Sequence, residues 1–459
     1  MSRLISRFVQ YGNNELELMD FFADRIEKNI VKNDKIYSLS AQYPSSRWFE
    51  RKIRDDFGLV IESCYDKRRL IHHESFPKVY PMRKEFNLFS KLNFDYFEPY
   101  DYEKISGSGV FNVSVGPIHA GIIEPGHFHF SQAGEQILHL EVRHFYKYRA
   151  VEKMCEGKKI EDIEKIVARI SGNESIAYQI GLSNIKYQSK ELHQSLEHKL
   201  QNAILLEFER LAHHFADIGF IPNDAGFSPA LAVGSRYSED VRRVLKKLTN
   251  SRFGFDIIDK ELNLFEKKEF ILDFLSYLER EINWFEEWII DIPSLWDRLD
   301  STGILNKKEA IRYGCVGVVA RASGIDNDTR SDDNFYTENG FTSCLRYKGD
   351  VASRFLVRID EIKNSLFIIK NMILKLKKTI SCNNLALSKD GEYFSLVESS
   401  IGEIFMYVKI ENSIISRFYV RDPSFINWQA LHLMMHNDII ADFPLINKSC
   451  DLSYAGNDL

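Results

Sequence analysis

The chain has 459 residues and a mass of 53.5 kDa, enough for two or three domains with a substantial core. Its 60 Lys and Arg residues against 66 Asp and Glu residues give a net charge of -6, which argues against a nucleic-acid-binding protein. No apolar run approaches the ~18–20 residues of a membrane helix, and the first residues lack the apolar core of a signal peptide. We therefore expect a cytoplasmic protein that reaches a membrane only through a partner.

The spacing of the cysteines excludes several kinds of local metal and redox motif. Six are scattered singly along the chain, and no CxxC pair occurs. Local zinc, haem-attachment and redox-dithiol motifs are therefore absent. Isolated thiols of this kind are typical of a reducing compartment.

The N-terminal region predicts a small α+β unit. Over residues 15–32, apolar side chains recur every four positions and predict an amphipathic helix: Leu18, Phe22, Ile26 and Ile30. Lys35–Gln42 alternates weakly, as a strand would, and Arg47–Phe57 is typical of a helix. A polar stretch that ends in Ser106-Gly107-Ser108-Gly109 predicts a linker.

The rest of the chain begins with predicted strands at Val110–Val115 and Gln136–Phe145, which we expect to pair. Residues 146–300 are mostly helical in pattern, and an apolar stripe from Phe355 to Leu376 predicts one long helix packed against the core. Ile404–Ile410 and Ser413–Val420 predict a β-hairpin, and a short helix with an irregular tail follows. The fold class is therefore α+β. A small α+β domain at 1–106 precedes a mostly helical domain at 107–459 that has a small N-terminal antiparallel sheet.

Three histidine-containing patterns are candidate sites. His127 and His129 share one face of a strand, where a polar surface is favoured over a metal site. In the His213–His214 pair, we expect one ring to face inward and form a hydrogen bond. The loop at 116–126 has His119 and Glu124 as its only ionisable groups. They could relay protons, although the residues alone favour a structural turn.

A charged segment near residue 325 combines opposite charges with small residues. Arg321, Asp326, Asp328 and Arg330 stand beside Gly and Ala, which indicates either a buried ionic network or a contact between subunits. No phosphate-binding glycine-rich motif and no nucleophile elbow occurs.

Six segments carry a shared resemblance: GPIHAGIIEPGHFHF, ERLAHHFADIGFIPNDAGF, ARASGIDNDTRSD, GDVASRFLVRIDEIKNS, RDPSFINWQALHLMMHNDIIADFPLINKS and the ending LSYAGNDL. Together they resemble one superfamily, the large subunits of membrane-bound nickel–iron hydrogenases of the formate hydrogenlyase type and the quinone-site subunit of respiratory complex I. Upstream, RWFERKIRDDFGL and YPMRKEF are similar to the small hydrophilic subunit of complex I, shortened here. That domain order matches the fused proteins of formate hydrogenlyase.

The sequence differs from this family at the positions that bind the metal. Its hydrogenases hold nickel and iron through four thiolates, in RxCGxC and DPCxxC motifs. The corresponding positions here hold Ser171, Glu174, Ser424 and Asn427, and the arginine above the metal is replaced by Ile401. Hydroxyl, amide and single carboxylate groups do not suit a soft transition-metal centre. The resemblance therefore implies a family member without a nickel–iron site.

The quinone ligands of complex I also do not carry over, since their positions fall near Ile123 and on Gly172. Four residues that do carry over are expected at the catalytic cavity: His119, Glu124, Arg169 and Asp422. Four others are expected in structural or interface roles: His214, Arg321, Asp328 and Arg330.

The resemblance implies an oxidoreductase subunit of a complex related to NADH:quinone oxidoreductase and energy-converting hydrogenases. It would form the acceptor cavity beside a small iron–sulfur subunit, with membrane-embedded ion-translocating subunits as further partners and no nucleic acid. We expect no cofactor bound by the chain itself, an iron–sulfur cluster in the partner, and a quinone as a candidate acceptor. The complex would place the chain on the cytoplasmic face of the inner membrane. The alternative is a non-catalytic scaffold that kept the fold and lost redox work.

Overall fold

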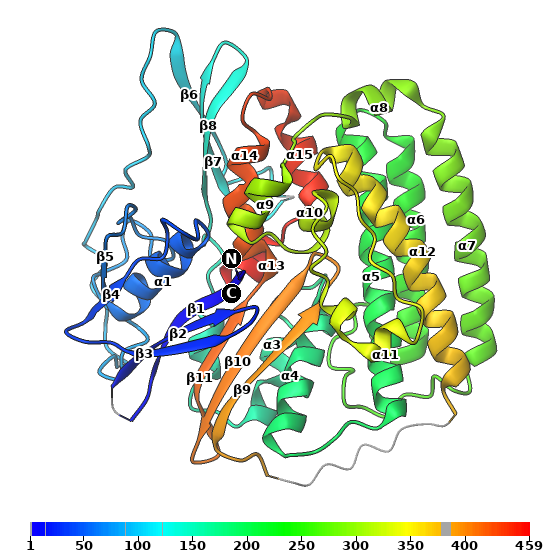
Figure 1. The fold of residues 1–459 in the computed structure, drawn as a ribbon, viewed down its shortest axis with the longest axis horizontal. Helices are drawn as coiled ribbons and strands as arrows, with labels where there is room; N and C mark the ends of the chain where they lie inside the picture. The colour runs from blue at the N-terminus through cyan, green and yellow to red at the C-terminus, as the bar shows by residue number, and fades with distance from the viewer. Residues whose placement is uncertain (1, 14, 88, 122, 378–386) are drawn as a thin grey trace.

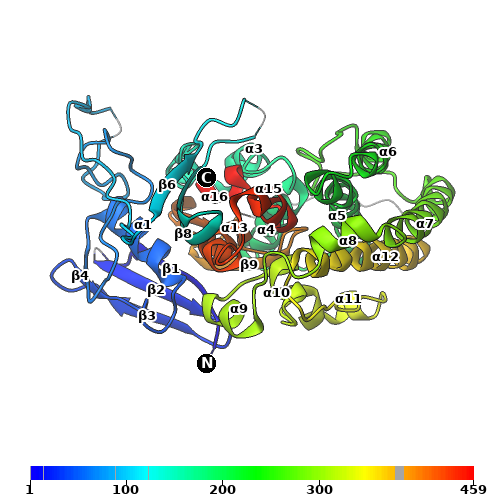
Figure 2. The ribbon, with the colours of Figure 1, turned by 90° about the horizontal axis from the view of Figure 1, so that it is seen from above.

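The computed structural model describes residues 2–13, 15–87, 89–121, 123–377 and 387–459, and within these it is an α+β protein with several small antiparallel sheets. Figure 1 shows the sheets on the left and a group of long helices on the right. Figure 2 shows the C-terminal helices between these two parts. This arrangement confirms the predicted fold class. None of the helices in the described parts of the chain is long and apolar enough to cross a membrane.

Four long helices make up the helical half: α5 (Leu196–Asp224), α6 (Pro229–Thr249), α7 (Lys268–Ile290) and α12 (Val351–Lys375). The apolar stripe predicted from Phe355 lies on α12 and is buried, which confirms its role in core packing. Helices α5 and α6 approach closely where Gly219 faces Gly234. A Cβ on Gly234 would lie 2.6 Å from the carbonyl oxygen of Phe215.

Short helices connect these parts. Four of them confirm the mostly helical pattern predicted for residues 146–300: α2 (Val151–Cys155), α3 (Glu164–Val167), α4 (Ser175–Ser189) and α8 (Pro293–Leu299). The others lie beyond that region: α9 (Lys307–Tyr313), α10 (Gly317–Ala322), α11 (Asn334–Thr337), α13 (Pro423–Asn427), α14 (Leu431–Met434), α15 (Phe443–Cys450) and α16 (Tyr454–Asp458). The predicted irregular tail is wrong, since α15 and α16 cover most of it. Helix α16 begins where the Ser453 hydroxyl accepts a hydrogen bond from the Gly456 N–H, 2.9 Å away.

The predicted hairpin is confirmed and belongs to a three-stranded antiparallel sheet. It consists of β9 (Gly391–Glu398), β10 (Glu403–Glu411) and β11 (Ile414–Arg421), in the order β11-β10-β9. Its central strand β10 is buried on both faces, because α4 covers one face and the N-terminal sheet covers the other. An inserted strand of this kind has no alternating polar face, which explains its continuous apolar pattern.

The predicted helix over 15–32 is wrong. This segment forms β2 (Leu16–Phe22) and β3 (Ile26–Ile30), which complete an antiparallel sheet with β1 (Leu4–Tyr11). A spacing of four residues also returns a side chain to the same face of a strand, so it does not distinguish the two structures. The segment around β2 forms a strand because its side chains are buried on both faces.

An aromatic cluster joins the N-terminal sheet to the β9–β11 sheet. The Phe8 ring stacks on Tyr419 at 4.2 Å and contacts Tyr407 at 4.9 Å, while Phe21 lies 4.8 Å from Phe405. The rings are buried together, so residues from the two predicted units share one core at this place.

The remaining N-terminal elements follow the sequence pattern. The predicted helix is α1 (Ser46–Phe57), which ends at Gly58 in the left-handed conformation. The predicted strand at Lys35–Gln42 holds for β4 (Lys35–Tyr37), which pairs in parallel with β5 (Val60–Glu62). On the far side of the linker, β6 (Val110–Val115) and β8 (Gln136–Arg143) are strands as predicted. Their predicted pairing with each other is wrong, because β7 (His127–Ala133) lies between them and pairs with both.

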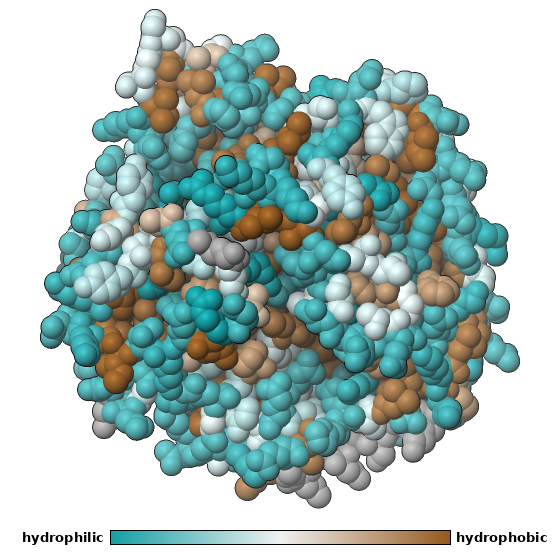
Figure 3. Space-filling view, in the orientation of Figure 1, coloured by the Kyte–Doolittle hydropathy of each residue, from teal (hydrophilic) through white to brown (hydrophobic). Residues whose placement is uncertain are grey.

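One large cavity opens beside the N-terminus. It has a volume of about 940 Å³ and is lined by the start of β1, by α9 and by the loop that follows α10. Figure 3 shows a hollow near the centre of this face, within a surface on which hydrophobic residues are scattered among polar ones.

Candidate functional site

The four positions that hold thiolates in the resembling hydrogenases come together at the centre of the molecule. Ser424 and Asn427 lie on α13, Ser171 follows α3, and Glu174 precedes α4. Ser453, just before α16, connects two of them. Its N–H donates to the Ser424 hydroxyl oxygen at 2.8 Å, and its hydroxyl lies 3.3 Å from that of Ser171.

The other two positions are also hydrogen-bonded. Asn427 forms two hydrogen bonds with the backbone of Val316. Its amide oxygen accepts from the Val316 N–H at 3.1 Å, and its amide nitrogen donates to the Val316 carbonyl oxygen at 3.1 Å. Glu174 is fully buried and accepts a hydrogen bond from the Ser399 hydroxyl. The donor set is therefore two hydroxyls, one amide and one carboxylate, each hydrogen-bonded to a neighbour, although the Oε2 atom of Glu174 has no hydrogen-bond partner among the described residues. It does not fit a nickel–iron centre.

Asp422 adds a second carboxyl group to this cluster. Its side chain caps α13 by accepting from the Ser424 N–H at 2.7 Å, and it also accepts from the Tyr178 hydroxyl. Burial raises the pKa of Asp422, and burial together with the nearby Asp422 charge raises the pKa of Glu174 well above its ordinary value. The centre therefore favours a proton on one of two buried carboxyl groups. Sequence reasoning missed Tyr178, which lies one helical turn after Glu174, and Ser453, which lies in the C-terminal ending LSYAGNDL, because no pattern marked either as a hydrogen-bond partner of the cluster.

The loop that carries His119 and Glu124 is tied to the C-terminal helix. His119 Nε2 lies 2.7 Å from the carbonyl oxygen of Gly126. Glu124 forms an ion pair with Lys147 and accepts from the Ala455 N–H at 2.9 Å. The structure thus places Glu124 beside α16, near the cluster described above, and its predicted relay role stays a prediction.

Arg169 lies apart from the cluster. Its side chain is 48% exposed and forms a two-armed ion pair with Asp256, with distances of 2.8 and 2.6 Å. It therefore faces the protein surface at the start of the segment that leads to Ser171.

The charged segment near residue 325 forms a buried ionic network, one of the two alternatives that its sequence allowed. Arg321 is fully buried and binds three carboxylates, at 3.0 Å from Asp328, 2.6 Å from Glu361 and 2.7 Å from Glu398. Arg330 lies 2.7 Å from Asp328 and 3.1 Å from Glu207, which also pairs with Arg210 at 3.0 Å. Asp326, the fourth predicted member, is exposed and lies outside the network.

Both histidines of the 213–214 pair are buried, although only one was expected to face inward. His214 Nε2 lies 2.8 Å from Glu361, and burial lowers the pKa of His214 to about 4. Burial also disfavours the charged form of His213, but Asp217 and Asp451 outweigh this and raise its pKa to about 10. The two rings and Asp217 are close enough together to hold a metal ion. Cations already occupy Asp217, with Arg358 at 2.8 Å and Lys448 at 3.3 Å, and they disfavour a metal there.

His127 and His129 share one face of β7, with their rings 6.4 Å apart. His127 Nδ1 lies 3.1 Å from the Gly116 carbonyl oxygen, and His129 Nδ1 lies 3.0 Å from the Ser114 hydroxyl. These partners fit the polar strand face that the sequence favoured.

The buried carboxyl group of Glu209 should make the free energy of unfolding depend on pH. Its carboxyl group is buried beside the start of α4, where it accepts from the Ile176 N–H at 2.6 Å and the Ala177 N–H at 3.0 Å, and burial raises its pKa to about 8. A raised pKa means that the folded state binds the proton more tightly. The stability contribution is therefore present below the unfolded value of about 4.5 and is lost as the pH rises through about 8.

Glu209→Gln should remove this loss. Between pH 5 and about 8.5, its free energy of unfolding should fall less than that of the wild type, by on the order of a few kcal/mol. Urea unfolding across this range measures the difference, and Glu279→Gln, at an exposed position of α7, is the control. Parallel profiles for the wild type and Glu209→Gln would contradict the prediction.

Comparisons with known proteins identify the family. Residues 258–388 and 379–458 match the family described as respiratory-chain NADH dehydrogenase, 49 kDa subunit, and residues 9–91 match the 30 kDa subunit. Formate hydrogenlyase subunit 5 of Escherichia coli is 25% identical, over 98% of this chain and 84% of its own length. Hydrogenase-4 component G of the same organism is 26% identical over 92% and 75%.

The match extends to fused complex I proteins and to a solved structure. The C/D subunit of NADH-quinone oxidoreductase from Phocaeicola vulgatus is 24% identical over 90% of this chain and 85% of its own length. A chain of the membrane-bound sulfane sulfur reductase, an archaeal respiratory membrane complex, shares the fold with a TM-score of 0.70 and 21% identity, covering 77% of this chain and 99% of its own. The chain thus belongs to the family in which the 30 kDa and 49 kDa subunits of complex I are fused, related to the large subunits of formate hydrogenlyase and hydrogenase-4.

Proposed function

We propose that this chain is a subunit of a membrane-associated oxidoreductase complex of the complex I and hydrogenase type, in which it forms the wall of an acceptor cavity beside an iron–sulfur partner. The observation that carries the proposal is the central cluster. The family's fold brings Ser171, Glu174, Ser424 and Asn427 together, but as a hydrogen-bonded polar group. A member of this family that binds no metal at this place would pass electrons to an acceptor that enters the cavity from outside the chain.

The relatives support the setting of this proposal. Two of them are named as a formate hydrogenlyase subunit and an NADH-quinone oxidoreductase subunit, and the chain of similar fold belongs to a respiratory membrane complex. An iron–sulfur cluster in the partner would supply electrons, and a quinone is one candidate acceptor. The chain's own task would be to shape the cavity and hold protons, for which the buried carboxyl groups of Glu174 and Asp422 are suited.

A specific observation favours the alternative, a non-catalytic scaffold. The side chains at all four former ligand positions are engaged by neighbours, and Glu124 braces its loop against α16 through Lys147 and Ala455. These contacts would stabilise the fold with or without redox work.

Purification of the native complex tests the proposal. The tagged chain, extracted from membranes in mild detergent, should co-purify with a small cysteine-rich subunit and with iron and sulfide. A monodisperse chain that captures no iron–sulfur subunit would overturn it. An intact complex that contains the cluster but turns over no acceptor would favour the scaffold.

Glu124→Gln tests the predicted proton relay. If Glu124 relays protons, the variant should assemble normally and reduce turnover of the complex by about tenfold or more, the range of one general acid–base group. Lys147→Gln is the matched control, because it removes the same ion pair but keeps the carboxyl group of Glu124. Equal losses in both variants would indicate bracing of the loop, and unchanged turnover in Glu124→Gln would reject the relay.

A further inference from the structure

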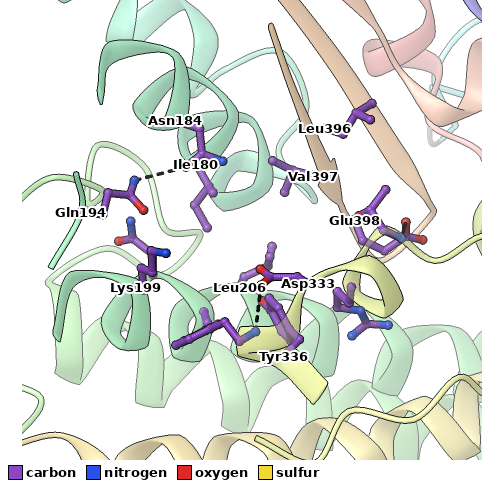
Figure 4. A pocket seen from close by; sticks show the side chains of 15 residues that line it. Ile180, Asn184, Gln194, Lys199, Leu206, Asp333, Tyr336, Leu396, Val397 and Glu398 are labelled. Carbon is purple, nitrogen blue, oxygen red and sulfur yellow. Dashed lines mark hydrogen bonds between the residues drawn. The ribbon is translucent and has the colours of Figure 1, made fainter. Parts of the chain in front are cut away.

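A pocket of about 270 Å³ lies between α4, α5, α11 and the end of β9. Figure 4 shows Ile180 and Val397 on its upper side and Leu206 and Tyr336 on its lower side. These four residues are buried, whereas Lys199 is exposed and stands at the mouth. None of the four former ligand positions is among its described lining residues, so the pocket is separate from the central cluster.

Two buried polar side chains line this pocket without partners. Asn202 on α5 is 4% exposed, and neither atom of its amide has a hydrogen-bond partner among the described residues. The hydroxyl of Tyr336, a residue 8% exposed, also has none there. Buried polar groups in folded proteins are normally paired with the chain, with water or with a ligand. The partner of these two groups therefore comes from whatever fills the pocket.

Water alone is a poor filling for this pocket. Its polar groups lie among buried apolar side chains, those of Ile180, Leu206 and Val397, and a water molecule against such a wall loses hydrogen bonds. A ligand that pairs with the polar groups and also covers the apolar wall gains affinity when it displaces poorly ordered water. The lining therefore favours a molecule with an apolar body and one polar edge.

The amide of Asn202 determines which polar edge fits. It presents an oxygen that accepts hydrogen bonds beside an NH₂ group that donates them. The complementary group has a donor beside an acceptor in one plane, as a carboxamide or a lactam does. An ionised carboxylate only accepts, so it would leave the amide oxygen of Asn202 unpaired.

The charges around the pocket indicate a ligand without net charge. Its charged lining residues carry, when ionised, two charges of each sign: Lys199, Arg330, Asp333 and Glu398. Arg330 and Glu398 are paired within the ionic network, and the Asp333 carboxylate accepts from the Phe335 N–H at 2.9 Å. The lining therefore offers no surplus charge to an ion.

We propose that this pocket binds a small uncharged molecule whose planar amide edge pairs with Asn202 and uses the Tyr336 hydroxyl as a further hydrogen-bond partner. The volume lies below the ~300–1,000 Å³ of pockets for drug-sized ligands, so it suits a single ring that carries a carboxamide, or a lactam ring. The ring would lie between the apolar side chains of the two sides. The inference goes beyond the proposed function, since binding needs neither the iron–sulfur partner nor turnover.

Three probes of the same shape test the proposal on the full-length chain, with any co-purifying subunit retained. Benzamide has the amide edge, acetophenone replaces its NH₂ group by a methyl group, and benzoate replaces the amide by a carboxylate. In saturation-transfer NMR titrations, benzamide should bind at millimolar concentration. The other two should bind at least about tenfold more weakly, because each leaves a buried polar group unpaired. Equal affinities for benzamide and acetophenone would overturn the amide site, and no binding of benzamide would overturn the ligand site altogether.

Two variants assign the binding to this pocket. Asn202→Leu keeps the side-chain size but has no amide, so benzamide should lose its preference over acetophenone. Tyr336→Phe removes only the hydroxyl and should weaken benzamide binding several-fold. Asn223→Leu, at the other end of α5, is the matched control and should bind all three probes like the wild type. Wild-type binding in both pocket variants would overturn the assignment, and if Asn202→Leu does not fold, Tyr336→Phe and the probe series on the wild type decide.

Discussion

Arg321→Met should lower the free energy of unfolding by more than about 4 kcal/mol, or prevent folded protein from accumulating. Methionine matches the length of the arginine stem but carries no charge. Three buried carboxylates, those of Asp328, Glu361 and Glu398, would then lose the cation that they share. Removing one partner of a buried ion pair typically costs ~3–5 kcal/mol, and here one side chain serves three.

Arg312→Met is the matched control. Arg312 lies on α9, is 52% exposed and pairs only loosely with Glu309 at 3.4 Å. Exposed pairs of this kind contribute about 0–1 kcal/mol, so this variant should unfold at nearly the wild-type denaturant concentration. Urea titration of both proteins gives the comparison. Similar midpoints for the two variants would mean that the network around Arg321 does not hold the helical half together.

The second large effect concerns nickel. Protein produced together with active nickel-insertion machinery should contain far less than one nickel per chain, because hydroxyl, amide and carboxylate groups replace the four thiolates that such a centre needs. Elemental analysis of the purified protein measures this. A hydrogenase large subunit that keeps its four cysteines, produced in the same cells, is the positive control. About one nickel per chain would show that another set of residues binds the metal.

The sequence correctly predicted those elements whose hydrophobic periodicity fits only one kind of secondary structure. The stripe on α12 and the β10–β11 hairpin are of this kind, as is α1. The segment 15–32 failed because a spacing of four residues fits both a helix and a strand, and only the core beneath β2 decides between them. Strand β7 was not placed between β6 and β8, since strand order in a sheet depends on tertiary packing.

The candidate site was predictable only in part. The resemblance identified the former ligand positions, but not that Ser453 and Tyr178 would bond to residues of this cluster. The pairing of charges around Arg321 followed from composition, whereas its partners Glu361 and Glu398 come from a helix and a strand far along the chain. Such contacts are set by the three-dimensional fold, and a single sequence does not contain them.

The aromatic cluster between the two sheets has a consequence for biosynthesis. Phe8 is synthesised long before Phe405 and Tyr419, against which it packs, because these lie about 400 residues later in the chain. At a synthesis rate of about 5–20 residues per second, the N-terminal sheet waits roughly 20–80 s with this face exposed. Nascent chains should therefore depend on a chaperone that shields this aromatic surface until β10 and β11 have been synthesised. Chains truncated before β10 should aggregate even though most of their helices are complete.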